Sequence, residues 1–243
     1  MQSWALTDPG CVRTQNQDSY ILEKLDRNTL LCVVCDGMGG AKSGNVASNM
    51  AAVVFSREIR RNYRGNMDAD ALSELLRQAV KLANFTVHDQ SGRVEEYEGM
   101  GTTLVAAVVR GRTVTVVNVG DSRVYRIDGE DIHMITTDHS LVQLMIQRGE
   151  LRPEQARSFP GKNYITRAIG TEPTVVCDVF RQELKKGEVL LLCSDGLTNL
   201  VDDQEILFEV LHGVGLDDCC QRLLNIAKNR GAPDNVTSIL VRV

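Results

Sequence analysis

The order of the helical and extended patterns constrains the fold of this sequence more than any other feature. Two helical segments, 43–62 and 68–90, follow each other directly, and strands are then predicted at 102–109, 113–119 and 122–127 with short turns between them. A parallel sheet needs a crossover connection, usually a helix, between successive strands. The lack of β-α-β alternation therefore argues against a Rossmann-like parallel sheet. It predicts an α+β fold in which antiparallel sheets carry helices on their outer faces.

Hydrophobic periodicity and capping signals define the other elements. Asp202 and Glu205 have the spacing of a capping box and predict that a helix begins near residue 202. Helix 68–90 is expected to bury one apolar face, formed by Leu72, Leu75, Leu76, Ala79, Leu82 and Ala83. The remaining predicted elements are a helix at 216–229 and strands at 3–7, 19–24, 30–35, 175–183, 188–193 and 236–243.

Composition and charge narrow the function classes. The chain has 243 residues and is 43% hydrophobic, enough for a sizeable core, and we interpret residues 1–243 as one domain. The net charge is −5 and no run of Lys or Arg occurs, which argues against nucleic acid as a partner because phosphate-backbone binding needs a basic surface. The N-terminus lacks a secretory-signal pattern, and the longest apolar stretch, LVAAVV, is too short to cross a membrane. We therefore expect a cytoplasmic protein without membrane insertion.

The seven cysteines predict reduced thiols rather than a disulfide framework, because their number is odd and no signal peptide precedes them. Cys32 and Cys35 form a C-x-x-C pattern inside a predicted strand, where positions i and i+3 point to opposite faces. One metal ion could not easily bind both, so we expect buried structural cysteines. The four histidines are scattered and form no zinc-binding pattern.

Acidic residues recur where apolar strands begin or end. The runs LLCVVCDG and VLLLCSDG both finish in Asp-Gly, and the five acids in such places are Asp18, Asp36, Asp121, Asp195 and Asp234. One such acid is usually a turn former. Five acids that met at one edge of the sheets would repel one another unless a cation neutralised them. Carboxylate oxygens without Cys or His favour Mg²⁺ or Mn²⁺ over Zn²⁺, so convergence of these acids would predict a hard-ion site.

Eight short stretches occur in a fixed order along nearly the whole chain. They are RTQNQD (13–18), VVCDGMGG (33–40), GMGTTLVAAV (99–108), VNVGDSRVYRI (117–127), TTDHSLVQ (136–143), ITRAIGTEP (165–173), LLCSDGLTN (191–199) and APDNVTSILV (232–241). Each stretch is a weak signal alone, but the ordered set is highly specific. The set resembles the metal-dependent serine/threonine phosphatases of the PPM type, also called protein phosphatase 2C, in their bacterial branch.

The resemblance implies both an architecture and a metal centre. Family members are similar in having two central antiparallel sheets flanked by helices, a four-layer α-β-β-α sandwich with the active site at one edge. Carried onto this sequence, Asp36 would bridge two ions of Mn²⁺ or Mg²⁺, and the backbone carbonyl of Gly37 would bind one of them. Asp195 and Asp234 would complete the shell of the first ion. Asp18 would hold metal-bound water near the second ion.

The resemblance also implies how the substrate is bound and cleaved. Asp121, with Asp195, would match a third metal site seen in bacterial members. The two catalytic ions would activate a water that attacks phosphorus in line, without a phosphoenzyme. Arg13 would grip the phosphate oxygens with its planar guanidinium, and Asn235 would orient Asp234 from the second shell. The expected enzyme is a monomeric phosphoprotein phosphatase that opposes a serine/threonine kinase.

Some positions depart from the family pattern or have open roles. Met38 stands where the animal branch has a histidine proposed to protonate the leaving group, and His139 is interpreted as structural rather than as that acid. Ala41 and Asn45 stand where bacterial relatives often have His and Glu, which affects the rim of the site. Residues 141–163 match the flap region of the family and are interpreted as facing the substrate. Thr102 and Thr103 are expected to be structural.

Three other functions fit the sequence less well than the phosphatase. A regulator that binds phosphoproteins but has weak catalysis would keep the fold, yet a scaffold has no physical need for Asp36, Asp195 and Asp234 together. A regulator dedicated to one phosphoprotein would often carry a sensory domain, for which the chain has no room. A metal-dependent nuclease could use similar two-ion chemistry, but the sequence shows no basic groove. The sequence therefore predicts the phosphatase, with the weak regulator as the alternative.

Overall fold

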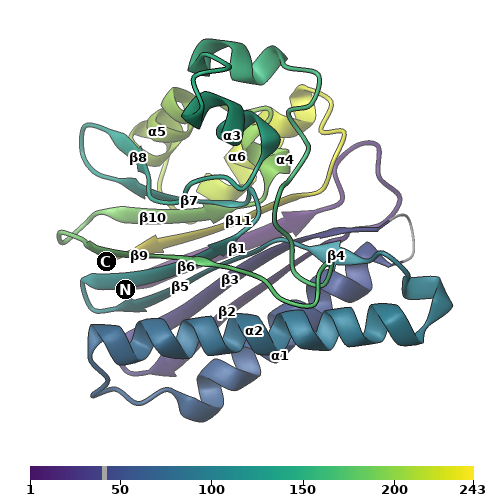
Figure 1. The fold of residues 1–243 in the computed structure, drawn as a ribbon. Helices are drawn as coiled ribbons and strands as arrows, with labels where there is room; N and C mark the ends of the chain where they lie inside the picture. Colours follow the sequence, from purple (N-terminus) through teal and green to yellow (C-terminus); the bar gives the residue numbers. More distant parts are fainter. Residues whose placement is uncertain (40–42) are drawn as a thin grey trace.

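The computed structural model describes residues 1–39 and 43–243. In this part of the chain, two antiparallel sheets lie face to face and helices cover both outer surfaces, as Figure 1 shows. Helices α1 (Gly44–Asn62) and α2 (Ala69–Arg93) cover one sheet, and α5 (Asp203–His212) and α6 (Cys219–Asn229) cover the other. The predicted α+β, four-layer sandwich is confirmed.

The sheet beneath α5 and α6 has the strand order β1-β11-β10-β7-β8 in the described residues. Each of its neighbouring pairs is antiparallel. Its strands are β1 (Gln2–Asp8), β7 (Arg123–Ile127), β8 (Ile132–Met134), β10 (Val189–Cys193) and β11 (Val236–Arg242).

The sheet beneath α1 and α2 has the order β2-β3-β5-β6-β9, again antiparallel, with the short β4 paired to the end of β3. Its strands are β2 (Asp18–Asp26), β3 (Thr29–Met38), β4 (Gly101–Thr102), β5 (Leu104–Arg110), β6 (Thr113–Val119) and β9 (Asp178–Glu183). The shorter helical elements are η1 (Glu95–Tyr97), α3 (Leu141–Gln147), η2 (Pro153–Ser158) and α4 (Asp195–Thr198).

The buried side chains form one apolar cluster in each interface between layers. Leu31, Val33 and Cys35 of β3 pack under α1 and α2, while Cys32 and Val34 of the same strand pack between the sheets. Another cluster lies under α5 and α6. The alternation along β3 confirms that Cys32 and Cys35 point to opposite faces. In the described part of the chain all seven cysteines are free, and all but Cys11 are buried.

Several predicted boundaries were wrong. The predicted strand 102–109 is divided, because β4 turns aside to pair with β3 and β5 begins only at Leu104. The predicted strand 175–183 begins at Asp178. Leu82 is 41% exposed and so does not belong to the buried face of α2. The capping box of α5 is present as predicted, with bonds between Asp202 and Glu205. No helix among the described residues is long and apolar enough to span a membrane.

Candidate active site

The acids predicted from the strand ends gather at one edge of the sandwich. Asp36 lies near the end of β3 and pairs in register with Asp18 at the start of β2. At the other sheet, Asp195 lies two residues after the end of β10, and Asp234 lies two residues before the start of β11, the antiparallel neighbour of β10. The end of one antiparallel strand lies beside the start of the next, so the topology brings these positions together. Asp121 joins them from the turn between β6 and β7.

A pocket of about 640 Å³ opens at this edge. Among its walls are Arg13, Asp36, Asp121, Asp195 and Asp234. The other predicted site residues include Gly37, which also lines the pocket, and Asp18 and Asn235, which do not. A second hollow of about 700 Å³, beside the turn 185–188, contains none of the predicted site residues.

Two threonines hold the backbone of Asp36. The Asp36 N–H donates to Thr103 Oγ1 at 2.9 Å, and Thr102 Oγ1 donates to the Asp36 carbonyl at 2.8 Å. Thr103 Oγ1 also lies 2.8 Å from Ser122 Oγ, next to Asp121. The expectation that both threonines are structural is confirmed, but their place is at the site. In the sequence these residues show only as the adjacent threonines of GMGTTL, and nothing in that stretch indicates that Asp36 is their hydrogen-bond partner.

The glycines of both Asp-Gly pairs permit close backbone approach. A Cβ on Gly37 would lie 2.0 Å from the carbonyl oxygen of Gly44, the first residue of α1. A Cβ on Gly196 would lie 1.9 Å from the carbonyl oxygen of Asn235. Neither contact tolerates a side chain, so each Asp-Gly pair packs its glycine closely against the backbone of a neighbouring segment.

Burial and mutual repulsion act on the acids in the same direction. Burial raises the pKa of Asp36 well above its ordinary value, and the charges of Asp18, Asp195, Asp121 and Asp234 raise it further. Burial, and then the charges of Asp195 and Asp138, raise the pKa of Asp121 to about 8. Burial and Asp234 also raise the pKa of Asp195, against hydrogen bonds with Asp36 and Asn199 that lower it. The second of these bonds runs from Asn199 Nδ2 to Asp195 Oδ2 at 2.9 Å.

Asp18 is the most enclosed of the acids, at 7% exposed, and it links the two sheets. Its Oδ2 accepts hydrogen bonds of 2.7 Å from Ser194 Oγ and from Thr237 Oγ1. Ser194 directly follows β10 and Thr237 lies in β11, and both strands belong to the other sheet. The Oδ1 of Asp18 is buried and has no hydrogen-bond partner among the described residues. Burial raises the pKa of Asp18 to about 7, although these two hydroxyl bonds lower it.

Asn235 ties the N-terminal loop to the acids. Its Oδ1 accepts from the Gln17 N–H at 2.8 Å, and its Nδ2 donates to the carbonyls of Pro9 and Gln15 at 3.0 Å. The adjacent Asp234 accepts a 2.9 Å bond from Arg13 Nη2, with both side chains partly exposed. This bond uses one of the five N–H groups of the guanidinium.

The donor set fits hard divalent ions. Buried carboxylates that raise one another's pKa, together with the unpartnered Asp18 Oδ1, favour a bound cation. Within residues 1–39 and 43–243, no three His, Cys, Asp or Glu side chains are grouped tightly enough to hold an ion by themselves. Mg²⁺ keeps several waters and uses only one or two carboxylates, so this looser arrangement suits it better than Zn²⁺.

The other sequence-predicted positions divide between the site and its surroundings. Met38 lines the pocket, as do Lys162 and Asn163 at the end of the 141–163 segment. His139 is buried and is not among the residues that line this pocket, and its Nδ1 accepts from the Gly120 N–H at 3.1 Å, as expected of a structural residue. Asn45 lines a separate groove with Asn16 and Ser19. Ala41 lies outside the described residues.

Comparisons with known proteins agree with this geometry. The chain is 36% identical over 245 residues to Protein phosphatase PhpP of Streptococcus pneumoniae, covering 99% of this chain and 97% of the relative. It is 34% identical over 235 residues to Serine/threonine phosphatase stp of Listeria monocytogenes, covering 97% and 93%. The crystal structure of Serine/threonine phosphatase Stp1 from Staphylococcus aureus matches all of this chain and 94% of that one, with 35% identity and a TM-score of 0.94. Residues 12–240 match the family model for Protein phosphatase 2C, and the chain therefore belongs to the protein phosphatase 2C family.

Proposed function

We propose that this protein hydrolyses phosphoserine and phosphothreonine esters in proteins and depends on divalent metal ions. The observation that carries the proposal is the meeting of Asp36, Asp121, Asp195 and Asp234 with Arg13 around one pocket. The family membership supports the phosphatase reaction. The alternative, a phosphoprotein-binding regulator with weak catalysis, lacks comparable support because the relatives are named phosphatases and these acids are present.

The carboxylates are the proposed ligands of two catalytic Mn²⁺ or Mg²⁺ ions. Asp36, the Gly37 carbonyl, Asp195 and Asp234 would hold these ions. Asp18 would act through water, and Asp121 with Asp195 would hold a third ion. When bound, such ions activate a water for attack on phosphorus and offset the charge of the phosphate.

The protein's own side chains would bind the substrate and keep the ligands in place. Arg13 lines the pocket, and its planar guanidinium would match two phosphate oxygens. Thr103 fixes the backbone of Asp36, and Asn199 orients one oxygen of Asp195. Asn235 keeps the loop that carries Arg13 next to Asp234. Lys162 and Asn163, which also line the pocket, would contact the rest of a phosphoprotein chain.

The proposed partners are phosphorylated proteins, including those modified by a serine/threonine kinase that this enzyme opposes. The free thiols suit a reducing compartment, and we assign the activity to the cytoplasm on that basis.

Hydrolysis of a small aryl phosphate and of a phosphothreonine peptide, each with Mn²⁺ or with a chelator, tests the proposal. We expect activity that needs the metal and falls at least about 100-fold in Asp195→Asn, because a metal ligand is lost. Asp217→Asn, which removes an exposed acid outside the pocket, is the matched control and should retain full activity. Full activity in Asp195→Asn, or activity unaffected by the chelator, would refute the assignment.

A further inference from the structure

A partly buried cation, the guanidinium of Arg123, lies close to the acids of the pocket, with its side chain 28% exposed. Arg123 begins β7, two residues after Asp121, and pairs in register with Cys193, two residues before Asp195. Burial raises the pKa of both acids, and the positive charge of Arg123 lowers both in part. The register of β7 and β10 therefore places Arg123 beside two proposed metal ligands. Opposite charges at such range normally pair.

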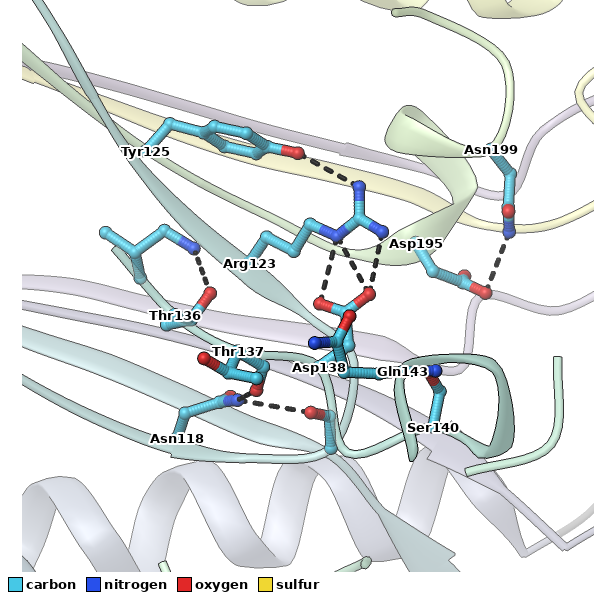
Figure 2. A network of polar contacts seen from close by, with 12 residues as sticks. Asn118, Arg123, Tyr125, Thr136, Thr137, Asp138, Ser140, Gln143, Asp195 and Asn199 are labelled. Atoms are coloured by element: carbon cyan, nitrogen blue, oxygen red, sulfur yellow. Dashed lines mark hydrogen bonds and ion pairs between the residues drawn. The ribbon is translucent and has the colours of Figure 1, made fainter. Parts of the chain in front are cut away.

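The guanidinium pairs instead with Asp138. Arg123 Nε lies 3.0 and 3.1 Å from the two carboxylate oxygens of Asp138, and Nη2 lies 2.7 Å from Oδ2. The remaining nitrogen, Nη1, donates to the Tyr125 hydroxyl at 3.0 Å. Figure 2 shows the guanidinium facing Asp138 and Tyr125, while Asp195 lies alongside and is bonded to Asn199. All three nitrogens of Arg123 thus bond to Asp138 or Tyr125 and not to the proposed metal ligands.

The backbone around Asp138 is fixed on both sides. The Val124 N–H donates to Thr136 Oγ1 at 3.1 Å, and Asn118 Nδ2 donates to the Thr137 carbonyl at 3.1 Å. On the other side, the His139 N–H donates to the Gly120 carbonyl at 2.9 Å. Asp138 is therefore a rigid partner, and it can dictate where the longer Arg123 side chain points.

We propose that Asp138 is a positioning residue that keeps the Arg123 guanidinium away from Asp121 and Asp195, so that these carboxylates stay available to a divalent cation. The inference rests on the proposed function, since it assumes that these acids bind metal. The Arg123–Asp138 pair is neutral as a whole. Without the Asp138 charge, the partly buried guanidinium would turn to Asp121 or Asp195, because a cation that is largely removed from water gains by pairing with a nearby carboxylate. It would then compete with the metal.

Mn²⁺ binding to the intact protein, measured by calorimetry or by the electron paramagnetic resonance of free Mn²⁺, tests the proposal. Asp138→Asn keeps the shape of the side chain and removes its charge. We expect Mn²⁺ to bind at least about tenfold more weakly, since an opposite charge within about 4–6 Å weakens the hold of a carboxylate on a proton by 10- to 1000-fold. A Mn²⁺ affinity within about twofold of wild type would overturn the proposal.

Two further variants separate competition from simple loss of structure. The double variant Arg123→Met with Asp138→Asn removes the competitor, so Mn²⁺ affinity should return to within about threefold of wild type. A double variant that binds as weakly as Asp138→Asn would overturn the proposal. Arg123→Met alone leaves an added negative charge and should bind Mn²⁺ as well as wild type or better. If Asp138→Asn does not fold, a tenfold loss of affinity in Arg123→Met would refute the idea.

The same strand supplies a matched control. Arg126 and Glu188 form a bidentate pair, with bonds of 2.8 and 2.7 Å, at the far end of β7 and β10 from the acids. Glu188→Gln should destabilise the fold without changing Mn²⁺ affinity, and a loss equal to that of Asp138→Asn would contradict our inference. Wild-type protein that binds no Mn²⁺ would instead refute the proposed function itself.

Discussion

The stability of the metal-free protein should fall as pH rises through the range in which the site acids ionise. Burial raises the pKa of Asp18 from 3.8 to about 7. Between these values the folded protein retains a proton that the unfolded chain has released, so the free energy of unfolding decreases with increasing pH. The full shift corresponds to about 4 kcal/mol at 1.36 kcal/mol per pKa unit, of which about 2 kcal/mol is lost above pH 5.5.

Neighbouring acids act in the same direction, and one histidine opposes them. Burial and its acidic neighbours raise the pKa of Asp121 to about 8, and Asp36 and Asp195 shift the same way. These acids interact, so their contributions do not simply add. Burial lowers the pKa of His139, so its contribution to stability grows as pH rises. We expect the acids to dominate because there are more of them and their shifts are larger.

Urea unfolding of chelator-treated protein at about pH 5.5 and about pH 8 measures the effect. Asp18→Asn is the comparison, because its amide oxygen can still accept from Ser194 and Thr237 while the titrating group is removed. The variant should lose about 2 kcal/mol less than wild type over this range, and the His139 contribution cancels between them. Mn²⁺ should restore wild-type stability at the higher pH, because a bound ligand stabilises the folded state. Metal-free stability that is flat, or that rises equally in both proteins, would refute this reasoning.

Three substitutions examine other parts of the site. Thr103→Val should lower kcat about tenfold and the free energy of unfolding by about 1–3 kcal/mol, because the Asp36 N–H loses its hydrogen-bond partner. An unchanged kcat would show that this bond does not position Asp36. Gly196→Ala should destabilise the protein by more than about 2 kcal/mol in urea unfolding, because the added methyl group would clash with the Asn235 carbonyl. Gly92→Ala is the control, since Gly92 is exposed in α2 with open space at its Cβ position, and it should be neutral or stabilising by up to about 1 kcal/mol. Arg13→Lys should reduce kcat/KM for a phosphopeptide about tenfold, since an ammonium cannot form the bidentate contact, and an equal kcat/KM would argue against phosphate binding by Arg13.

The fold and the acids could be predicted because both follow from local signals. The order of the predicted elements argued against a parallel sheet. The position of each acid at the start or end of an apolar strand could be read directly from the sequence. Short elements such as β8 and α4 carry too few residues for a periodic pattern. Leu82 fits the helical spacing, but spacing fixes only the direction of an apolar face and not its width, and the side chain lies outside the covered part of α2.

The groups that hold the acids could not be predicted, because each bond joins distant segments. Thr103 accepts a hydrogen bond from the Asp36 N–H, 67 residues away in the sequence. Ser194 and Thr237 donate hydrogen bonds to Asp18, which is 176 and 219 residues away from them. Hydroxyl residues in strands and turns have ordinary local explanations, and only the packing of the sheets selects their partners. The Arg123–Asp138 pair, 15 residues apart, was equally hidden within two family motifs.

These long-range bonds place the site on the seam between the two sheets. Asp18 and Asp36 come from the sheet under α1 and α2, whereas Asp195 and Asp234 adjoin strands of the other sheet. The relative position of the two pairs of acids therefore depends on the apolar layer between the sheets, where Val34 and Leu192 are fully buried. A metal ion shared by acids from both sides would in turn join the sheets at this edge. Packing of the central layer and metal binding should for this reason stabilise one another, because each fixes the spacing that the other requires.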